Sequence, residues 1–283
     1  MTSTGYATAL GAGTIINAIA TWKGSAFGID LQTSAEVQLN NSDRIKGTIK
    51  GGGNPKLIER CVQLVFEKFN CQEGATVKTK SDVPIASGLK SSSAAANASV
   101  LAALDAIGEK MEPLDAALLG VQAAKDARVT ITGAFDDAAA SVLGGVVVTD
   151  NRELSLISRN VMESEVIIYA PMKKAYSSKT DVKQSRLVAP WVDMAYELCI
   201  EGKYEKAMTL NGFLYCSALG FDTGPMLMAL EAGVEGTSLS GTGPAYTALA
   251  HGETADCVAD AWSVLDGRVI RTKVNNNGAQ IGR

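Results

Sequence analysis

The sequence has few of the side chains that most often carry out acid–base and metal chemistry. It contains a single histidine, His251, and its five cysteines include no Cys-x-x-Cys pair. One histidine excludes an HExxH metal site and restricts any Ser-His-Asp triad to His251. We interpret His251 as a strand-end residue, because it follows an apolar run and precedes Gly252. Chemistry in this chain is therefore expected to depend on carboxylates, serines, lysines, backbone amides and a metal carried by the substrate.

Other absences exclude further classes of protein. The cysteines are odd in number and unpaired in sequence, which indicates reduced thiols in a cytoplasmic protein rather than a disulfide framework. The formal net charge is −4 and no basic stripe is present, so no nucleic-acid partner is expected. Residues 1–10 lack a basic segment ahead of an apolar one, and no apolar run could cross a bilayer. We therefore expect neither a signal peptide nor a membrane partner.

The remaining composition is that of a globular protein with a sizeable core. The 283 residues, 46% hydrophobic and 20% charged, suit one large domain or two of ordinary size. Periodicity predicts strands at 14–20, 26–39 and 74–83 and helices at 51–70, 91–107 and 112–127. After about residue 155 the pattern restarts, with a strand, two helices, a glycine-interrupted strand, a helix and a last strand. A domain boundary is therefore expected near 150–165.

One loop combines glycine, lysine and serine directly before a helix. The stretch PIASGLKSSSAAANASV covers residues 84–100, and its helix begins at about Ser91. The first turn of a helix offers free N–H groups and a partial positive charge, both of which suit phosphate oxygens. Gly88 allows close backbone approach, Lys90 adds a point charge, and the serine hydroxyls suit phosphate or Mg²⁺. The stretch is not a Walker A loop, which needs a Gly-Lys-Ser/Thr run. The alternative is an ordinary serine-capped helix.

Two further stretches favour the phosphate-binding interpretation. SLSGTGPAYTAL, at 238–249, places a glycine-rich turn inside a strand, although a β-bulge or tight turn would fit as well. TGAFDDAAASVLGG, at 132–145, places Asp136 and Asp137 among small residues that pack closely. At least one of these acids is expected to point into a cleft, unless the pair only marks the start of a helix.

Together the three stretches resemble the GHMP kinase superfamily of small-molecule kinases. The loop matches its PxxxGLxSSAA motif at Pro84, Gly88, Leu89, Ser91 and Ser92, and departs from it at Lys90, where glycine is usual, and at Ser93, where alanine is usual. LSGTGPAY resembles the third motif of the family. GTIINAIATWKGSAFGID, at 13–30, resembles the first motif, with Asn17 at its asparagine but without its leading proline. The resemblance covers nearly the whole chain.

Within the superfamily, the chain is most similar to the family of archaeal-type shikimate kinases, through GTIINAIATWKGSAFGIDL, SGLKSSSAAANA, GAFDDAAAS and TKVNNNGA. The resemblance implies the two-domain α+β GHMP kinase fold, with an N-terminal domain at 1–160 like ribosomal protein S5 domain 2 and a ferredoxin-like C-terminal domain at 161–283. It implies ATP, Mg²⁺ and the 3-hydroxyl of shikimate as reactants. The residues alone indicate phosphate binding and leave the acceptor open. A homoserine or mevalonate-type kinase, or a non-catalytic ligand-binding member, remains an alternative.

The resemblance also implies roles for particular residues. ATP is expected to lie on Pro84, Ile85, Ala86, Ser87, Gly88, Leu89, Lys90, Ser91, Ser92, Ser93 and Ala94, beside the third-motif turn Ser240, Gly241, Thr242 and Gly243. Ser92 is the implied Mg²⁺ ligand, together with the ATP phosphates. The substrate-binding candidates are Asn17, Lys23 and Ser25, and Arg128, Lys173 and Lys179 are candidate cations for the substrate carboxylate.

The acidic pair supplies the candidate catalytic base. Counting forward from Gly133, the family spacing favours Asp136, whereas counting back from residues 144–145 favours Asp137. In some members the acid only positions a lysine or the substrate. Because adjacent side chains point in different directions, one acid is expected to face the cleft and the other the packing or solvent. We assign the base to Asp136, with Asp137 as the alternative.

Overall fold

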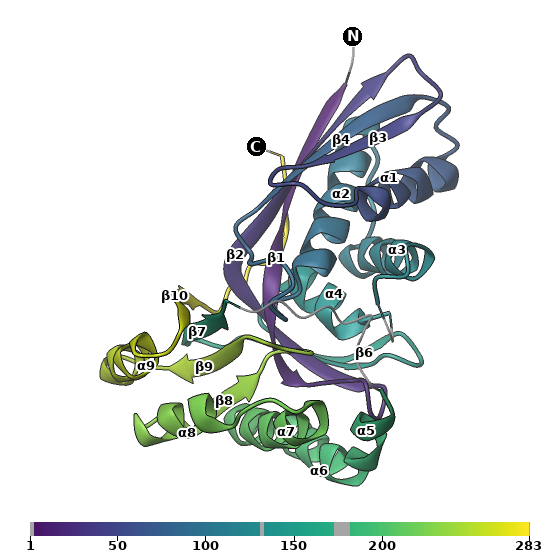
Figure 1. The fold of residues 1–283 in the computed structure, drawn as a ribbon. Coiled ribbons are helices and arrows are strands. Elements are labelled where there is room, and N and C mark those ends of the chain that lie inside the picture. Colours follow the sequence, from purple (N-terminus) through teal and green to yellow (C-terminus); the bar gives the residue numbers. More distant parts are fainter. Residues whose placement is uncertain (1–2, 131–132, 173–181, 283) are drawn as a thin grey trace.

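The computed structural model describes residues 3–130, 133–172 and 182–282 (Figure 1). Its first sheet has the order β11-β1-β2-β4-β3, and β5 and β6 extend it from β2. The strands are β1 (Thr4–Ile16), β2 (Lys23–Asn40), β3 (Ile45–Ile49), β4 (Gly74–Ser81), β5 (Val146–Asp150), β6 (Ser155–Asn160) and β11 (Gln280–Ile281). Neighbouring strands are antiparallel except for the pair β3 and β4. This sheet carries both ends of the described chain.

Four helices cover one face of the first sheet (Figure 1). They are α1 (Lys56–Phe69), α2 (Ser91–Ile107), α3 (Pro113–Asp126) and α4 (Phe135–Leu143). The alanines of α2 are largely buried, and α2 contacts β1, β2 and the other three helices. Small residues allow this close approach, because a Cβ on Gly5 would lie 2.2 Å from the carbonyl oxygen of Ala102. The C-terminal half of α2 therefore lies directly against β1.

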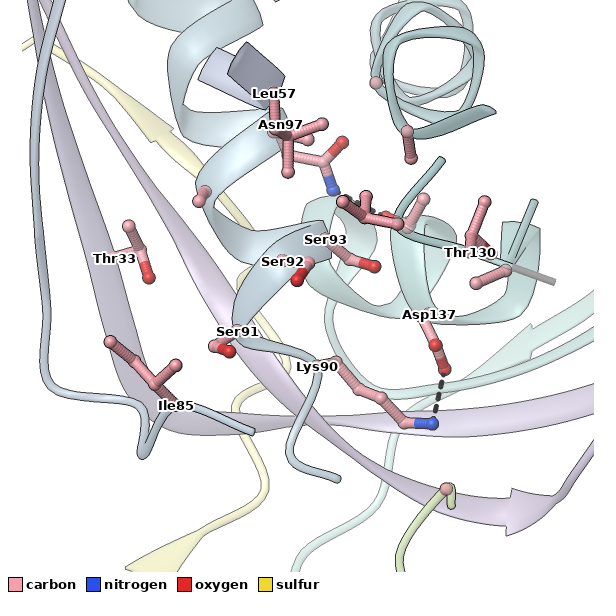
Figure 2. A pocket seen from close by; sticks show the side chains of 18 of the residues that line it. Thr33, Leu57, Ile85, Lys90, Ser91, Ser92, Ser93, Asn97, Thr130 and Asp137 are labelled. Carbon is pink, nitrogen blue, oxygen red and sulfur yellow. Dashed lines mark hydrogen bonds and ion pairs between the residues drawn. The ribbon is translucent and has the colours of Figure 1, made fainter. Parts of the chain in front are cut away.

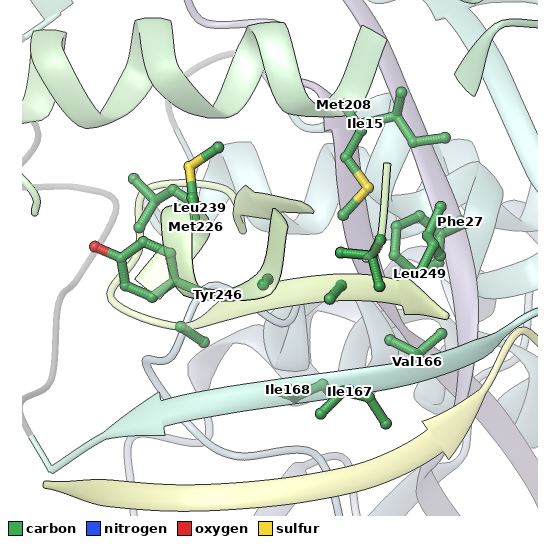
Figure 3. Close-up of a cluster of buried hydrophobic side chains, with 14 of the residues drawn as sticks. Ile15, Phe27, Val166, Ile167, Ile168, Met208, Met226, Leu239, Tyr246 and Leu249 are labelled. Atoms are coloured by element: carbon green, nitrogen blue, oxygen red, sulfur yellow. The ribbon is translucent and has the colours of Figure 1, made fainter. Parts of the chain in front are cut away.

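The second sheet has the order β10-β7-β9-β8 and is antiparallel. Its strands are β7 (Glu165–Pro171), β8 (Gly236–Leu239), β9 (Tyr246–Ala250) and β10 (Gly267–Lys273). The accompanying helices are α5 (Val182–Leu187), α6 (Ala189–Ile200), α7 (Tyr204–Leu219), α8 (Gly224–Glu231) and α9 (Glu253–Ser263). Ile15 and Phe27 of the first sheet belong to the same buried cluster as Val166 and Leu249 of the second (Figure 3). One continuous core therefore joins the two sheets.

The strand expected at 14–20 begins and ends earlier in the structure. β1 runs from Thr4 to Ile16, and Asn17, Ala18 and Ile19 in the turn that follows line the site described below. The elements β3, β6, β11, α5 and α8 were not expected, since they are short and carry weak periodicity. β6 ends at Asn160 and β7 begins at Glu165, while β11 returns to the first sheet. The division into domains 1–160 and 161–283 stays a prediction. No helix in the described part of the chain is long and apolar enough to span a membrane.

Candidate functional site

A cavity of about 470 Å³ lies where the first turns of α2 and α4 meet. Its walls come from the loop before α2, the turn after β1, the turn between β8 and β9, and parts of β2, β3, β4, α1 and α3. Figure 2 shows Ser91, Ser92 and Ser93 in the first turn of α2, with Lys90 extending across to Asp137 on α4. The cavity thus places a helix N-terminus, a lysine and carboxylates around one space.

The loop before α2 has an unusual backbone. Ala86, Gly88 and Lys90 all have positive φ, at 56°, 90° and 64°. Lys90 is the N-cap of α2, and no side chain caps this helix end. The alternative of a serine-capped helix is therefore wrong, because the serines occupy the first helical turn rather than the cap. The uncapped N–H groups of this turn are the donors that an anion at a helix N-terminus uses.

The glycine turn between β8 and β9 packs directly on this loop. The Ser240 hydroxyl donates a hydrogen bond to the Gly88 carbonyl at 3.0 Å, and the Ala245 N–H donates to the Ser87 carbonyl at 2.9 Å. A Cβ on Gly88 would lie 2.0 Å from the Ser240 carbonyl oxygen, so only glycine fits there. The glycine turn therefore meets the phosphate loop in space, although Ser240 is 152 residues away from Gly88 along the chain.

Of the expected ATP-binding residues, Ile85, Ala86, Gly88, Lys90, Ser91, Ser92 and Ser93 line the cavity, as do Gly241 and Thr242 of the turn. The others lie behind this wall. The Ser87 hydroxyl donates to the Pro84 carbonyl at 2.8 Å, and the side chains of Leu89 and Ala94 are fully buried. Gly243 packs against Phe221, where a Cβ would lie 2.7 Å from the ring. These residues hold the loop in its shape, and their side chains do not line the cavity.

Asp137 is paired with Lys90. The Lys90 Nζ lies 3.0 Å from Asp137 Oδ1, and the two side chains are only 11% and 12% exposed. Burial raises the pKa of the Asp137 carboxyl to about 7, while the Lys90 charge opposes this rise and the Asp136 charge adds to it. Lys90 therefore has a fixed counterion on the opposite wall of the cavity.

Asp136 has a different partner. Its side chain is buried, and its Oδ1 accepts a hydrogen bond from Asn151 Nδ2 at 2.7 Å. Both acids are among the residues that line the cavity, and which of them faces the substrate stays a prediction. Successive residues of a helix are separated by about 100° rather than by half a turn, and the first turn of α4 projects into the cavity. Asp136 and Asp137 therefore both belong to the wall of the cavity.

The expected substrate-binding residues divide into two groups. Asn17 lines the cavity, and its Nδ2 donates to the Gly241 carbonyl at 2.8 Å. Lys23 lies outside the lining and forms an ion pair with Asp193 at 2.9 Å. Ser25 is fully buried, where its hydroxyl donates to the Val147 carbonyl at 2.7 Å. The structure thus brings Asn17 to the cavity, and Lys23 and Ser25 do not reach it. Arg128 is exposed, and Lys173 and Lys179 lie outside the described residues.

Two asparagines at the site were missed. Asn97 lines the cavity one helical turn beyond Ser93, and its Nδ2 donates to the Ala138 carbonyl at 3.0 Å, which ties α2 to α4. Its spacing of four from Ser93, within an alanine-rich helix, was a sequence signal that could have found it. Asn151 lies in the turn after β5, where asparagine is common, so nothing in the sequence distinguished it.

The chain is similar to known kinases both in sequence and in fold. A family model described as the GHMP kinases N terminal domain matches residues 56–145. The shikimate kinase of Methanococcoides burtonii is 61% identical to the chain, over 98% of the chain and 99% of the relative. The shikimate kinase of Methanosarcina mazei is 60% identical, over 99% and 97%. The crystal structure of homoserine kinase from Cytophaga hutchinsonii is similar with a TM-score of 0.77 at 19% identity, over 99% of the chain and 98% of that structure.

Proposed function

The chain belongs to the shikimate kinases of the GHMP kinase family, and on this premise we propose that it transfers the γ-phosphoryl group of ATP to the 3-hydroxyl of shikimate. The products are 3-phosphoshikimate and ADP, and the reaction serves aromatic amino acid biosynthesis. The observation that carries the proposal is the cavity in which the uncapped first turn of α2 and Lys90 lie opposite the acidic pair. That arrangement supplies positive potential for a phosphate chain beside carboxylates for an acceptor hydroxyl.

The phosphates of ATP lie on the first turn of α2. The N–H groups there and the positive end of the helix dipole favour negative charge. Lys90 reaches the same space and shifts from Asp137 toward the phosphates when nucleotide binds, because a polyphosphate carries more charge than one carboxylate. Ser91 and Ser93 add hydroxyls at the edge of the site.

The donor set also fits Mg²⁺. The exposed hydroxyl of Ser92 and the nearby carboxylates are the hard oxygen ligands that this ion prefers. No cluster of three or more His, Cys, Asp or Glu residues is found among the described residues. This suits an ion held chiefly by nucleotide phosphates, with Ser92 as its protein ligand. When bound, Mg²⁺ neutralises charge on the phosphates.

Asp136 acts as the base. The acceptor oxygen attacks the γ-phosphorus, the bond from that phosphorus to the β–γ bridging oxygen breaks, and its electron pair leaves with ADP. The hydroxyl proton passes to Asp136, whose carboxylate is held by the neutral amide of Asn151. We expect Asp136→Asn to lower kcat about 100-fold or more with a small effect on the KM for ATP. Steady-state kinetics on folded protein tests this, and abolished turnover in Asp137→Asn alone would reverse the assignment.

The acceptor lies on the Asn17 side of the acidic pair. Asn17 contacts it from the turn after β1, beside the Gly241 turn. Lys23 joins it only by leaving Asp193, and Ser25 acts through the strand that it holds in place. Arg128, Lys173 and Lys179 remain the candidate cations for the shikimate carboxylate.

An acceptor panel tests the proposal. Purified protein is incubated with ATP and Mg²⁺ and with shikimate, homoserine or mevalonate in turn, and the phosphorylated product is identified by ³¹P NMR. We expect ADP release to depend on shikimate and the product to carry phosphate at the 3-position. Phosphorylation of homoserine or mevalonate with shikimate left unchanged would overturn the substrate assignment. The same mixture without Mg²⁺ tests the requirement for the metal.

We place the enzyme in the cytoplasm. All five cysteines are free, and Cys61, Cys199 and Cys216 are buried. Free buried thiols suit a reducing compartment.

A further inference from the structure

Asn151 contacts the Asp136 carboxylate and backbone at once. Its Nδ2 donates to Asp136 Oδ1 at 2.7 Å, and its Oδ1 accepts from the Asp136 N–H at 3.2 Å. The same Oδ1 accepts from the Thr149 hydroxyl at 2.8 Å. Asn151 is only 2% exposed, although it lies in a turn, where asparagine is usually solvated. The oxygen and the nitrogen of this buried amide both have hydrogen-bond partners, so Asn151 belongs to a buried polar network and not to a solvated surface turn.

The network fixes which way the amide points. A backbone N–H can only donate, so the atom that faces the Asp136 N–H must be the amide oxygen. The amide nitrogen is then directed at the Asp136 carboxylate. The Asn151 N–H donates to the Trp22 carbonyl at 2.8 Å, which anchors the residue to the turn before β2. Thr149, which is fully buried, also donates toward the Gly24 carbonyl at 3.3 Å. Asn151 therefore cannot turn away without breaking several contacts.

The consequence is a fixed rotation of the Asp136 carboxylate. With Oδ1 bound to Asn151, Oδ2 lies on the Gly24 side, where a Cβ on Gly24 would be only 2.7 Å from it. The other acid, Asp137, is oriented by a cation, Lys90. The two adjacent carboxylates thus have partners of different charge, a neutral amide for Asp136 and a cation for Asp137.

We infer that Asn151 is a positioning residue for the reaction, which holds the Asp136 carboxylate in the orientation that accepts the acceptor's proton. The inference rests on the proposed role of Asp136. Thr149 supports it by holding the amide oxygen of Asn151.

The variant Asn151→Asp tests this with almost no change of shape. It keeps the oxygen that accepts from Thr149 and from the Asp136 N–H, and it replaces only the donor to Asp136 Oδ1. Two carboxylates in contact share a proton, so the acid limb of the kcat–pH profile should move up by about one unit or more. At neutral pH kcat should fall about 10-fold or more, while the KM for ATP stays within about 2-fold.

The matched control is Asn160→Asp, the same substitution on β6 of the same hairpin. Asn160 is exposed, and its Nδ2 donates to the Tyr204 hydroxyl at 2.8 Å, away from the cavity. We expect this variant to keep the parent kcat and pH profile. Thr149→Val, which leaves Asn151 in place but removes its support, should show a smaller loss in kcat. Thermal unfolding of each variant confirms that the compared proteins are folded.

A double-mutant cycle separates positioning from general damage. In an Asp136→Asn background, Asn151→Asp should change the residual rate less than about 2-fold, because its target is gone. An equal loss in both backgrounds would overturn the positioning role, as would a parental kcat and acid limb in Asn151→Asp alone. A parental rate in Asp136→Asn would instead overturn the base assignment and, with it, this inference.

Discussion

Lys90 replaces the glycine that is usual in the phosphate motif, and its backbone explains why glycine is usual there. The residue has a φ of 64° in the left-handed region, which costs a residue with a side chain about 1 kcal/mol or more. In exchange, its ammonium reaches Asp137 across the cavity and lies beside Gly241, where a Cβ would be 2.7 Å from it. The side chain is therefore placed to meet the phosphates that the loop binds.

Removal of the Lys90 charge should weaken nucleotide binding. We expect Lys90→Ala to raise the KM for ATP about 5-fold or more. A hydrogen bond to a charged group in a partly buried site contributes roughly 1.5–3 kcal/mol to the free energy of binding. The KM for shikimate should change less. Lys110→Ala, at an exposed site beyond α2, is the control. An unchanged KM for ATP would show that the lysine does not contact the nucleotide.

Asp137 should make stability depend on pH in a predictable direction. Burial holds the pKa of its carboxyl near 7, above the value of about 4 for an unfolded chain, so the folded state binds the extra proton between these limits. Its contribution to stability is then complete below about pH 4 and is lost as the pH rises toward 7. Asp137→Asn does not titrate. The melting temperature of the parent minus that of the variant should therefore decrease between about pH 5 and about pH 7. Each kcal/mol lost from the free energy of unfolding lowers the melting temperature by about 2–4 °C. A constant difference would contradict this.

At the scale of elements, α2 combines two tasks. Its alanines and other small residues let it pack among β1, β2 and three helices, while its N-terminus is left without a side-chain cap. Capping would satisfy the same N–H groups that bind phosphate, so the helix forgoes about 1 kcal/mol of capping energy at this end. Burial of its flank offsets this, since the side chains from Ala96 to Leu104 are nearly all inaccessible.

The serine hydroxyl at the second position of α2 should matter for the chemical step. Ser92→Ala removes the proposed ligand of the metal on the phosphates, and we expect kcat to fall about 10-fold or more. Ser99→Ala is a matched control on the same helix, because Ser99 is buried two turns further on and does not line the cavity. Steady-state kinetics over a range of Mg²⁺ concentrations measures the effect. A normal kcat in folded Ser92→Ala protein would rule out this role.

At the scale of the whole molecule, the end of the chain ties the site together. After β10 it returns to the first sheet, where the Gly145 N–H donates to the Asn275 carbonyl and the Ala279 N–H donates to the carbonyl of Val142 at the end of α4. β11 then pairs with β1 through Ala7 and Ile281. The helix that carries both acids is therefore supported by the final residues.

Truncation tests that support. Deletion of residues 279–283 removes β11 and the bond to Val142, so we expect the melting temperature to fall by about 5 °C or more. Because α4 loses a contact at its carboxyl end, kcat should fall more than the KM for ATP rises. Differential scanning calorimetry and kinetics measure both effects. A truncated protein as stable and active as the parent would show that α4 is held by its other neighbours alone.

The sequence by itself determined the long, strongly periodic elements and the identity of the family. The helix expected from Ser91 to Ile107 has those bounds in the structure, where Gly108 ends it in the left-handed conformation. The GHMP kinase fold and the shikimate kinase assignment, which were read from short motifs, are confirmed by the relatives. Such features depend on neighbours within a few residues, which periodicity and motif spacing record directly.

Only the tertiary structure decided the partners of the acids. Lys90 lies 47 positions from Asp137 and Asn151 lies 15 from Asp136, and each pair meets because α4 packs against both α2 and β5. The same packing turned Ser25 inward and directed Lys23 to Asp193. The charges and dipoles around a side chain depend on which elements enclose it, and burial can shift the pKa of the enclosed group by several units. Motif spacing and periodicity describe only neighbours along the chain, so they do not predict which elements enclose a side chain.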